Sequence, residues 1–185
     1  MPRDRAQVPR ELEVVVNNIS AHAPTHILAI QAKHIKRMFL YPVHAIIFAT
    51  QCASLPPFPH SHPTTPAEAG GKLTLPVLPL LIPSPSTFPI INEYLYTKCV
   101  DRIYAVLLPI SVRGARRSTH HFSETCAATF TVQALLSYAD RVHGLWANVE
   151  ALGVFDERLS QAMEMAWEVL LGALMISTGA RWQTA

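Results

Sequence analysis

A proline-rich stretch divides the amino-acid sequence and limits what its flanks can form. "PPFPHSHPTTPAEAGGK", Pro56 to Lys72, contains few side chains that a core could bury. Its prolines lack the backbone N–H that helices and sheets use, so regular structure cannot continue through it. We therefore predict that residues 56–72 form a loop or a partly disordered insert between two structured blocks.

The block before this insert favours short strands followed by a helix. Val14 to Val16 form a β-branched run, and residues 27–30 and 38–41 are apolar on either side of a basic turn. The two apolar runs around that turn predict two short strands, and Pro42 is expected to end the second of them. The alanine-rich "VHAIIFATQCASL", residues 43–55, then predicts a helix.

The block after the insert begins as extended chain and becomes helical. "LTLPVLPLLIP" is apolar, but Pro76 and Pro79 remove backbone donors, which predicts an edge strand or an interrupted one. Residues 86–97 and 101–109 then have apolar side chains at helical spacing, and Pro89 suits a first helical turn. These two stretches are predicted to be short helices.

The last third of the chain is predicted to be helical. A helix is expected from Thr125 or Thr129 to about Val142, where Gly144 ends it, and a second one over residues 145–152, closed by Gly153.

A longer final helix follows, and its start carries a capping signal. Asp156 is expected as the N-cap residue, since a carboxylate there accepts bonds from the first helical N–H groups. One face of this helix carries Leu159, Met163, Ala166, Leu170 and Leu174. Gly179 is the predicted C-terminal stop.

Length and composition are those of a folded domain. The 185 residues are 50% hydrophobic and 15% charged, with a formal net charge of +2. A chain of this length can bury a sizeable core, and its charge balance does not by itself indicate a nucleic-acid or membrane surface. We expect a flexible N-terminus (1–10), a single domain (11–178) and a tail (179–185).

Two apolar stretches could be mistaken for membrane spans. Residues 38–56 are uncharged over about the length that a span needs, yet they contain Pro42, His44 and Gln51. The apolar run at 169–177 is too short. Both are interpreted as buried elements. The N-terminus has no apolar signal-peptide core, and three widely spaced cysteines argue against a disulfide framework, so a reducing intracellular compartment is expected.

Two segments together resemble BTB/POZ domains. They are "YPVHAIIFATQCASLPP" and "TLPVLPLLIPSPSTFPIINEYLYT", and "QALLSYADRVHGLWANVEALGV" continues the likeness. The resemblance implies an α+β fold in which a small mixed sheet is flanked by helices and the C-terminal third is helical. The resemblance implies that His44 forms a hydrogen bond within the core or near a surface pocket, although a satisfied structural histidine is the commoner outcome.

A narrower resemblance covers roughly residues 27–152. "LYPVHAIIFATQCASLPP", "LPLLIPSPSTFPIINEYLYTK" and the following "LLP" look like the clampless proteins of mushroom-type and smut fungi. This resemblance implies a nuclear, non-enzymatic regulator of sexual development and clamp-cell formation. It would act by contact with a protein partner, such as a transcription or cell-cycle regulator. Presence in the cytoplasm and homo-oligomer formation stay open, and neither membrane nor direct nucleic-acid contact is expected.

A compact basic cluster is the first candidate binding site. Arg113, Arg116 and Arg117 lie in the polar segment 111–123, which is predicted to be an exposed loop. Such a cluster can bind an acidic partner or an import receptor, although solvated loop charge is the commoner outcome. A DNA-binding regulator that uses this loop is an alternative.

Two Ser/Thr-Pro dipeptides are candidate phosphorylation sites. They are Thr65-Pro66 and Ser84-Pro85, and Ser84 lies near a predicted helix start, where a phosphate is favoured.

The sequence predicts no catalytic, cofactor or metal site. No nucleophile elbow or phosphate loop is present. His60, His62, His120 and His121 leave one alternative open, a small hydrolase or metal-dependent enzyme that uses loop histidines.

Overall fold

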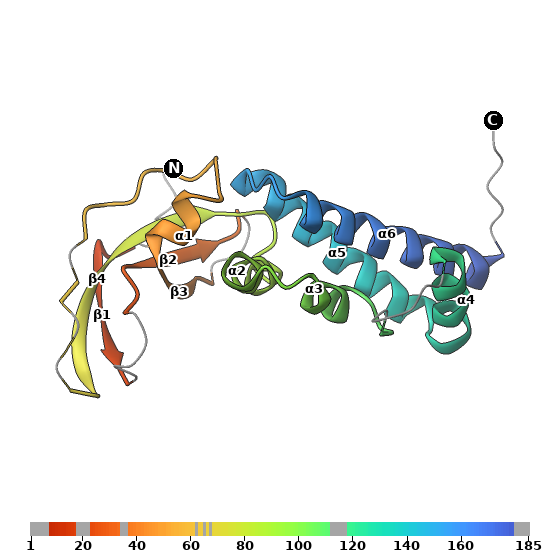
Figure 1. The fold of residues 1–185 in the computed structure, drawn as a ribbon, viewed down its shortest axis with the longest axis horizontal. Coiled ribbons are helices and arrows are strands. Elements are labelled where there is room, and N and C mark those ends of the chain that lie inside the picture. Colours follow the sequence, from red (N-terminus) through yellow and green to blue (C-terminus); the bar gives the residue numbers. More distant parts are fainter. Residues whose placement is uncertain are drawn as a thin grey trace, which may run out of the picture. The chain divides into compact units, whose positions relative to one another are not determined.

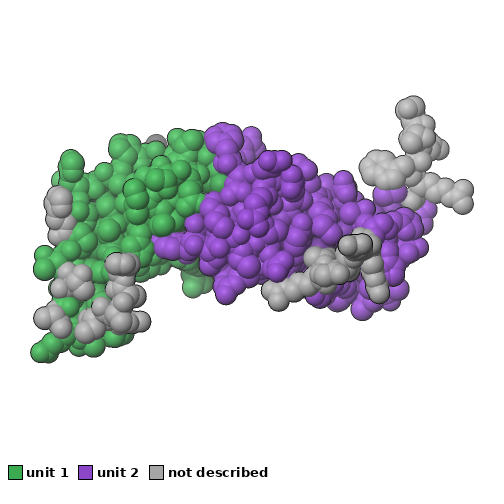
Figure 2. All heavy atoms as spheres, viewed as in Figure 1, with its two compact units in different colours: residues 1–85, 151–154 green, residues 86–150, 155–185 purple. Residues whose placement is uncertain are grey.

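The computed structural model describes residues 8–17, 23–33, 37–61, 63–64, 66, 68–111 and 118–179. The chain divides into unit 1, residues 1–85 and 151–154, and unit 2, residues 86–150 and 155–185 (Figure 2). The strands lie in unit 1, and the described elements of unit 2 are helices. The sequence predicts one domain over residues 11–178. Along the chain the elements are β1 (Glu11–Val16), β2 (His26–Gln31), β3 (Phe39–Val43), α1 (Ala45–Ala49), β4 (Gly71–Leu81), α2 (Phe88–Thr97), α3 (Val100–Leu107), α4 (Thr119–Thr129), α5 (Val132–Leu152) and α6 (Glu157–Thr178) (Figure 1).

Unit 1 is built on a four-stranded mixed sheet with the order β1-β4-β2-β3. Strand β4 is shared between two partners. Its first half, Gly71 to Pro76, pairs antiparallel with β1, and its second half pairs parallel with β2, while β3 is antiparallel to β2. The α+β class predicted from the sequence is confirmed.

The two prolines of β4 do not interrupt it, contrary to expectation. Val77 N donates to Arg10 O on the β1 side, and Ile82 N donates to Gln31 O on the β2 side. Backbone donors alternate between the two sides of a strand. The nitrogen of Pro79 therefore points to the β1 side, at a position beyond the last β4 residue that pairs with β1, which is Pro76. The nitrogen of Pro76 points to the β2 side just before that ladder begins. Neither missing N–H therefore costs a ladder hydrogen bond.

One face of the sheet carries an apolar cluster, and its buried members are Val16, Ile27, Ala29, Leu73, Leu75 and Val77. Strand β2 is buried on both faces, since His26, Leu28 and Ile30 are covered as well. The two short strands predicted before the insert both form as β2 and β3, and the β-branched run at Val14 to Val16 lies in a further strand, β1. Strand β3 runs on to Val43, one residue past Pro42, which an edge strand tolerates. Helix α1 is much shorter than the predicted 43–55.

Gly153 joins a late segment of the chain to unit 1. Its carbonyl accepts from Ala53 N (3.0 Å), and the Leu152 carbonyl accepts from Ser54 N (3.0 Å). Gly153 has φ +65°, and a Cβ there would lie 3.0 Å from Ser54 N. Both the left-handed backbone and the close approach require glycine. The predicted end of the helix at Gly153 is confirmed.

Unit 2 contains the helices α2 to α4, α6 and most of α5, and α6 packs against α3 and α4. The predicted exposed loop over residues 111–123 is too long. Ser118 caps α4 by accepting from His121 N, and Phe122 and Ser123 are buried. The helix expected from Thr125 or Thr129 to about Val142 is divided between two helices, α4, which begins at Thr119 and ends at Thr129, and α5, which begins at Val132.

Helix α5 passes through Gly144, where the sequence predicts an end. A mid-helix glycine costs about 1 kcal/mol relative to alanine. Burial on both sides of it, at Leu135, Val142, Leu145 and Val149, outweighs that cost.

One described helix, α6, has the length and apolar composition that could cross a membrane. Core helices pass the same test, and seven of its side chains are buried within the protein. These are Leu159, Ala162, Met163, Ala166, Val169, Leu170 and Ala173. This burial agrees with the interpretation of the 169–177 run as a buried element.

Candidate functional site

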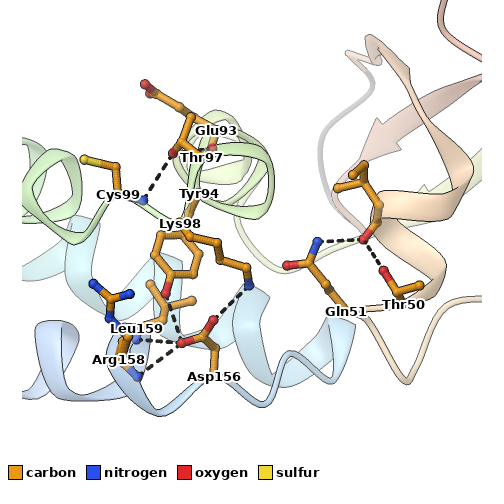
Figure 3. A network of polar contacts seen from close by, with 11 residues as sticks. Thr50, Gln51, Glu93, Tyr94, Thr97, Lys98, Cys99, Asp156, Arg158 and Leu159 are labelled. Carbon is orange, nitrogen blue, oxygen red and sulfur yellow. Dashed lines mark hydrogen bonds and ion pairs between the residues drawn. The ribbon is translucent and has the colours of Figure 1, made fainter. Parts of the chain in front are cut away.

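The best-defined polar cluster of unit 2 centres on the carboxylate of Asp156 (Figure 3). Its Oδ1 accepts from the Arg158 N–H (3.1 Å) and the Leu159 N–H (3.3 Å), which makes Asp156 the N-cap of α6 as predicted. The hydroxyl of Tyr94 donates to the same oxygen at 2.9 Å, and Lys98 Nζ donates to Oδ2 at 2.8 Å. One carboxylate thus ties the end of α2 to the start of α6.

Lys98 occupies an unusual backbone conformation at the end of α2. Its φ of 51° is left-handed, which costs a residue other than glycine roughly 1–2 kcal/mol. Its N–H donates to Tyr94 O (2.8 Å), and its Nζ lies 5.0 Å from the Tyr94 ring centroid. The lysine therefore ends the helix as a glycine would, and in addition delivers a cation to Asp156.

At neutral pH the Asp156 carboxylate is ionised and the Tyr94 phenol is neutral. Partial burial raises the pKa of Asp156, but hydrogen bonds from Lys98, Tyr94 and Leu159, with the Lys98 charge, bring the net pKa below its usual value. Burial, followed by the hydrogen bond to Asp156, raises the pKa of Tyr94 to about 12. A carboxylate that stays ionised and a phenol that stays neutral do not exchange protons near pH 7. The cluster thus holds structure in place and is not suited to acid–base chemistry.

Phe155, immediately before this cap, is the most exposed large apolar side chain among the described residues, at 89%. At this position an apolar residue commonly packs against the fourth residue of the helix. Here that residue is Ser160, which offers no apolar partner. The Phe155 ring is therefore left in solvent, while its backbone adjoins the fixed Asp156.

Most of the residues singled out as candidate sites lie outside the described residues. These are Arg113, Arg116, Arg117, Thr65 and His62. Ser84 is half-buried in the connection between β4 and α2. The roles predicted for the arginines, Thr65 and Ser84 stay predictions.

The histidines do not assemble a metal site within the described part of the chain. No group of three or more His, Cys, Asp or Glu side chains there could hold a metal ion. His60 is exposed, and the exposed His120 pairs with Glu124 at 3.6 Å. His44 is half-buried beside the start of α1, where its side chain makes no capping bond.

Two features of the described structure are missed by reasoning from the sequence. His26 is buried in unit 1, with Nε2 2.8 Å from Pro59 O. Phe155 stands beside the correctly predicted Asp156 cap. The polar Ser160 four residues after that cap is the signal that could have identified it.

Residues 1–83 match the Clampless protein 1 N-terminal domain, and residues 76–185 match the Clampless protein 1 C-terminal domain. Neither a curated protein nor a solved structure matches. The resemblance to BTB/POZ domains gains no support from these comparisons and stays a prediction. The two family models meet at residues 76–83, close to the boundary between the units at Pro85, and together they span the whole chain, which therefore belongs to the Clampless protein 1 family.

Proposed function

We propose that this protein is a non-enzymatic regulator of clamp-cell formation that binds a protein partner with Phe155 as an anchor. Membership of the Clampless protein 1 family implies the role in clamp-cell formation, and this family has no known catalytic activity. Binding is the activity that the surface of unit 2 supports best. The partner expected from the family resemblance is a transcription or cell-cycle regulator.

The exposure of Phe155 is the observation that carries this proposal. An aromatic ring at 89% exposure costs free energy in water, and that cost is recovered when the ring enters a partner's pocket. Binding energy concentrates in a few such anchors. The bonds of Asp156 already order the adjoining backbone, so binding has less conformational entropy to remove there.

The test is the variant Phe155→Ser in a fungal host that lacks its own copy of the gene. We expect the affinity for the partner to fall roughly tenfold, the change that a loss of about 1.4 kcal/mol produces. The number of clamp connections should fall with it. The stability of the purified variant should stay within about 0.5 kcal/mol of the parent, because the ring packs little in the folded chain. Counts of clamped septa and a thermal unfolding curve provide the two readouts.

Ile46→Ser is the matched control. Ile46 is 67% exposed on α1 and belongs to unit 1, so this variant also replaces an exposed large apolar side chain by serine, but in the other unit. This variant should restore clamp formation fully. Full restoration by Phe155→Ser as well would reject the proposed anchor.

A nuclear location and a role for the arginine cluster belong to the same proposal. With a fluorescent tag too large to diffuse through the nuclear pore, the parent should collect in nuclei. Replacement of Arg113, Arg116 and Arg117 by alanine should leave the tagged protein in the cytoplasm, because import receptors bind clustered cations. Unchanged nuclear signal would remove the import role.

A further inference from the structure

The segment Leu55–Ser61 of unit 1 is confined to one type of backbone by its own sequence. It reads Leu-Pro-Pro-Phe-Pro-His-Ser. Each proline has φ fixed near −65°, and each residue before a proline is pushed to extended or polyproline II conformation. Every residue from Leu55 to Pro59 falls under one or both restrictions. The described structure has no helix or strand in this segment.

The burial of this segment repeats every three residues. Leu55, Phe58 and Ser61 are half-buried, whereas the residues between them are exposed: Pro56, Pro57, Pro59 and His60. A polyproline II helix has three residues per turn, so residues three apart share a face. Pro56 and Pro59 therefore share one of the two outward faces, about 120° around the axis from the inward face of Leu55 and Phe58.

Contacts within unit 1 hold both ends of this segment. Before it, Ala53 and Ser54 donate their N–H groups to Gly153 O and Leu152 O, each at 3.0 Å. Towards its end, Nε2 of the buried His26 donates to Pro59 O (2.8 Å).

Two further contacts complete this anchoring. The His26 ring meets the Phe58 ring edge-on with a centroid distance of 4.9 Å, and Ser61 Oγ donates to Thr25 O at 2.7 Å. The Phe58 side chain is thus packed against His26, whereas Pro56 and Pro59 are exposed to solvent.

We propose that Pro56 and Pro59 form a docking site for a proline-recognising domain, one whose groove is lined by aromatic rings. Such grooves bind polyproline II segments with the spacing Pro-x-x-Pro, which Pro56 and Pro59 have. The fixed φ angles and the anchored ends mean that little backbone entropy is lost on binding. This site lies in unit 1 and does not depend on Phe155.

Binding can be measured with purified SH3, WW and EVH1 domains as probes, each ¹⁵N-labelled and titrated with the unlabelled full chain. At least one probe should show chemical-shift changes confined to its aromatic groove. Pro56→Ala and Pro59→Ala should each weaken that binding roughly tenfold, the equivalent of about 1.4 kcal/mol. Thermal unfolding of each variant verifies that the chain remains folded.

Two variants control for changes other than loss of a docked ring. Pro57→Ala loosens the segment equally but lies off the Pro56–Pro59 face, so affinity should fall less than about threefold. Pro89→Ala removes an exposed proline from the first turn of α2 and should leave binding unchanged. The proposal is overturned by the absence of shifts with all three probes, by shifts outside the groove, or by equal losses in Pro57→Ala and Pro56→Ala.

Discussion

Replacement of Asp156 by alanine is expected to lower the free energy of unfolding by about 3 kcal/mol. Loss of an N-cap costs about 1 kcal/mol. The mostly buried Tyr94 hydroxyl also loses its acceptor, which costs about 1–3 kcal/mol. The Lys98 pair adds less, since Lys98 is 41% exposed and its charge is screened by solvent. Chemical denaturation with urea would measure the loss.

Neighbouring variants separate these contributions. Glu157→Ala removes the next carboxylate, which is exposed and in the same helical turn, and should change stability by less than about 0.5 kcal/mol. Asp156→Asn keeps a capping oxygen while removing the charge, so its loss should be intermediate. A loss of under about 1 kcal/mol in Asp156→Ala would show that the cluster does not hold α2 to α6.

The same residue predicts how stability depends on acidity. The pKa of Asp156 is lower in the folded chain than its ordinary value, so the folded state favours the ionised form. Its contribution is therefore complete above the unfolded pKa of about 4 and is lost as the pH falls through the folded pKa. Asp156→Asn should flatten this part of the acid unfolding profile.

Alkaline conditions should act on Tyr94 in the opposite direction. Its pKa is raised to about 12 in the folded chain, above the usual value near 10. The folded state therefore favours the neutral phenol, and this contribution declines as the pH rises from about 10 through the folded pKa. Tyr94→Phe should remove that decline.

Replacement of Gly172 by leucine is expected to have a comparably large effect, about 3 kcal/mol. Gly172 lies within α6, where α4 crosses it closely. A Cβ at this position would lie 2.5 Å from Ser123 Oγ and 3.0 Å from Ser123 Cβ. Ser123 Oγ also donates to Val169 O at 3.0 Å, so it cannot turn aside without losing that bond. Overpacking of this kind costs about 1–3 kcal/mol, and the lost bond about 1 kcal/mol more.

A control and a paired substitution test the steric cause. Ser177→Leu introduces the same side chain at an exposed position of α6 and should cost less than about 0.5 kcal/mol. Gly172→Ala combined with Ser123→Gly should be more stable than the two single effects predict, because the second change makes room for the new methyl group. Strict additivity would contradict the proposed contact.

Local signals in the sequence were the reliable ones. The Asp156 cap and the left-handed glycines at 153 and 179 depend on a few neighbouring residues, and each appears where predicted. Two other predicted ends, at Gly144 and Pro42, were wrong, because α5 continues through Gly144 and β3 continues to Val43. The destabilisation caused by a mid-helix glycine or an edge-strand proline is small compared with the free energy gained when the continued element buries apolar side chains.

The candidate site shows the same division. Capping by Asp156 is readable because it concerns bonds within one helical turn. The partnership of Asp156 with Tyr94, 62 residues away, is not readable, since no local pattern brings the two elements together. The exposure of Phe155 is likewise not readable, because it depends on whether a distant segment packs over the ring. The hydrophobicity of phenylalanine alone predicts burial.

By itself, the sequence determined the fold class, the helix caps, the irregular proline segment and the resemblance to clampless proteins. Only the tertiary structure decided that β4 changes its pairing partner after Pro76 and that α4 packs closely against Gly172. It also decided which side chains remain exposed to solvent. The physical reason is range: caps and proline angles are set by adjacent atoms, whereas burial and pairing are set by segments far apart along the chain.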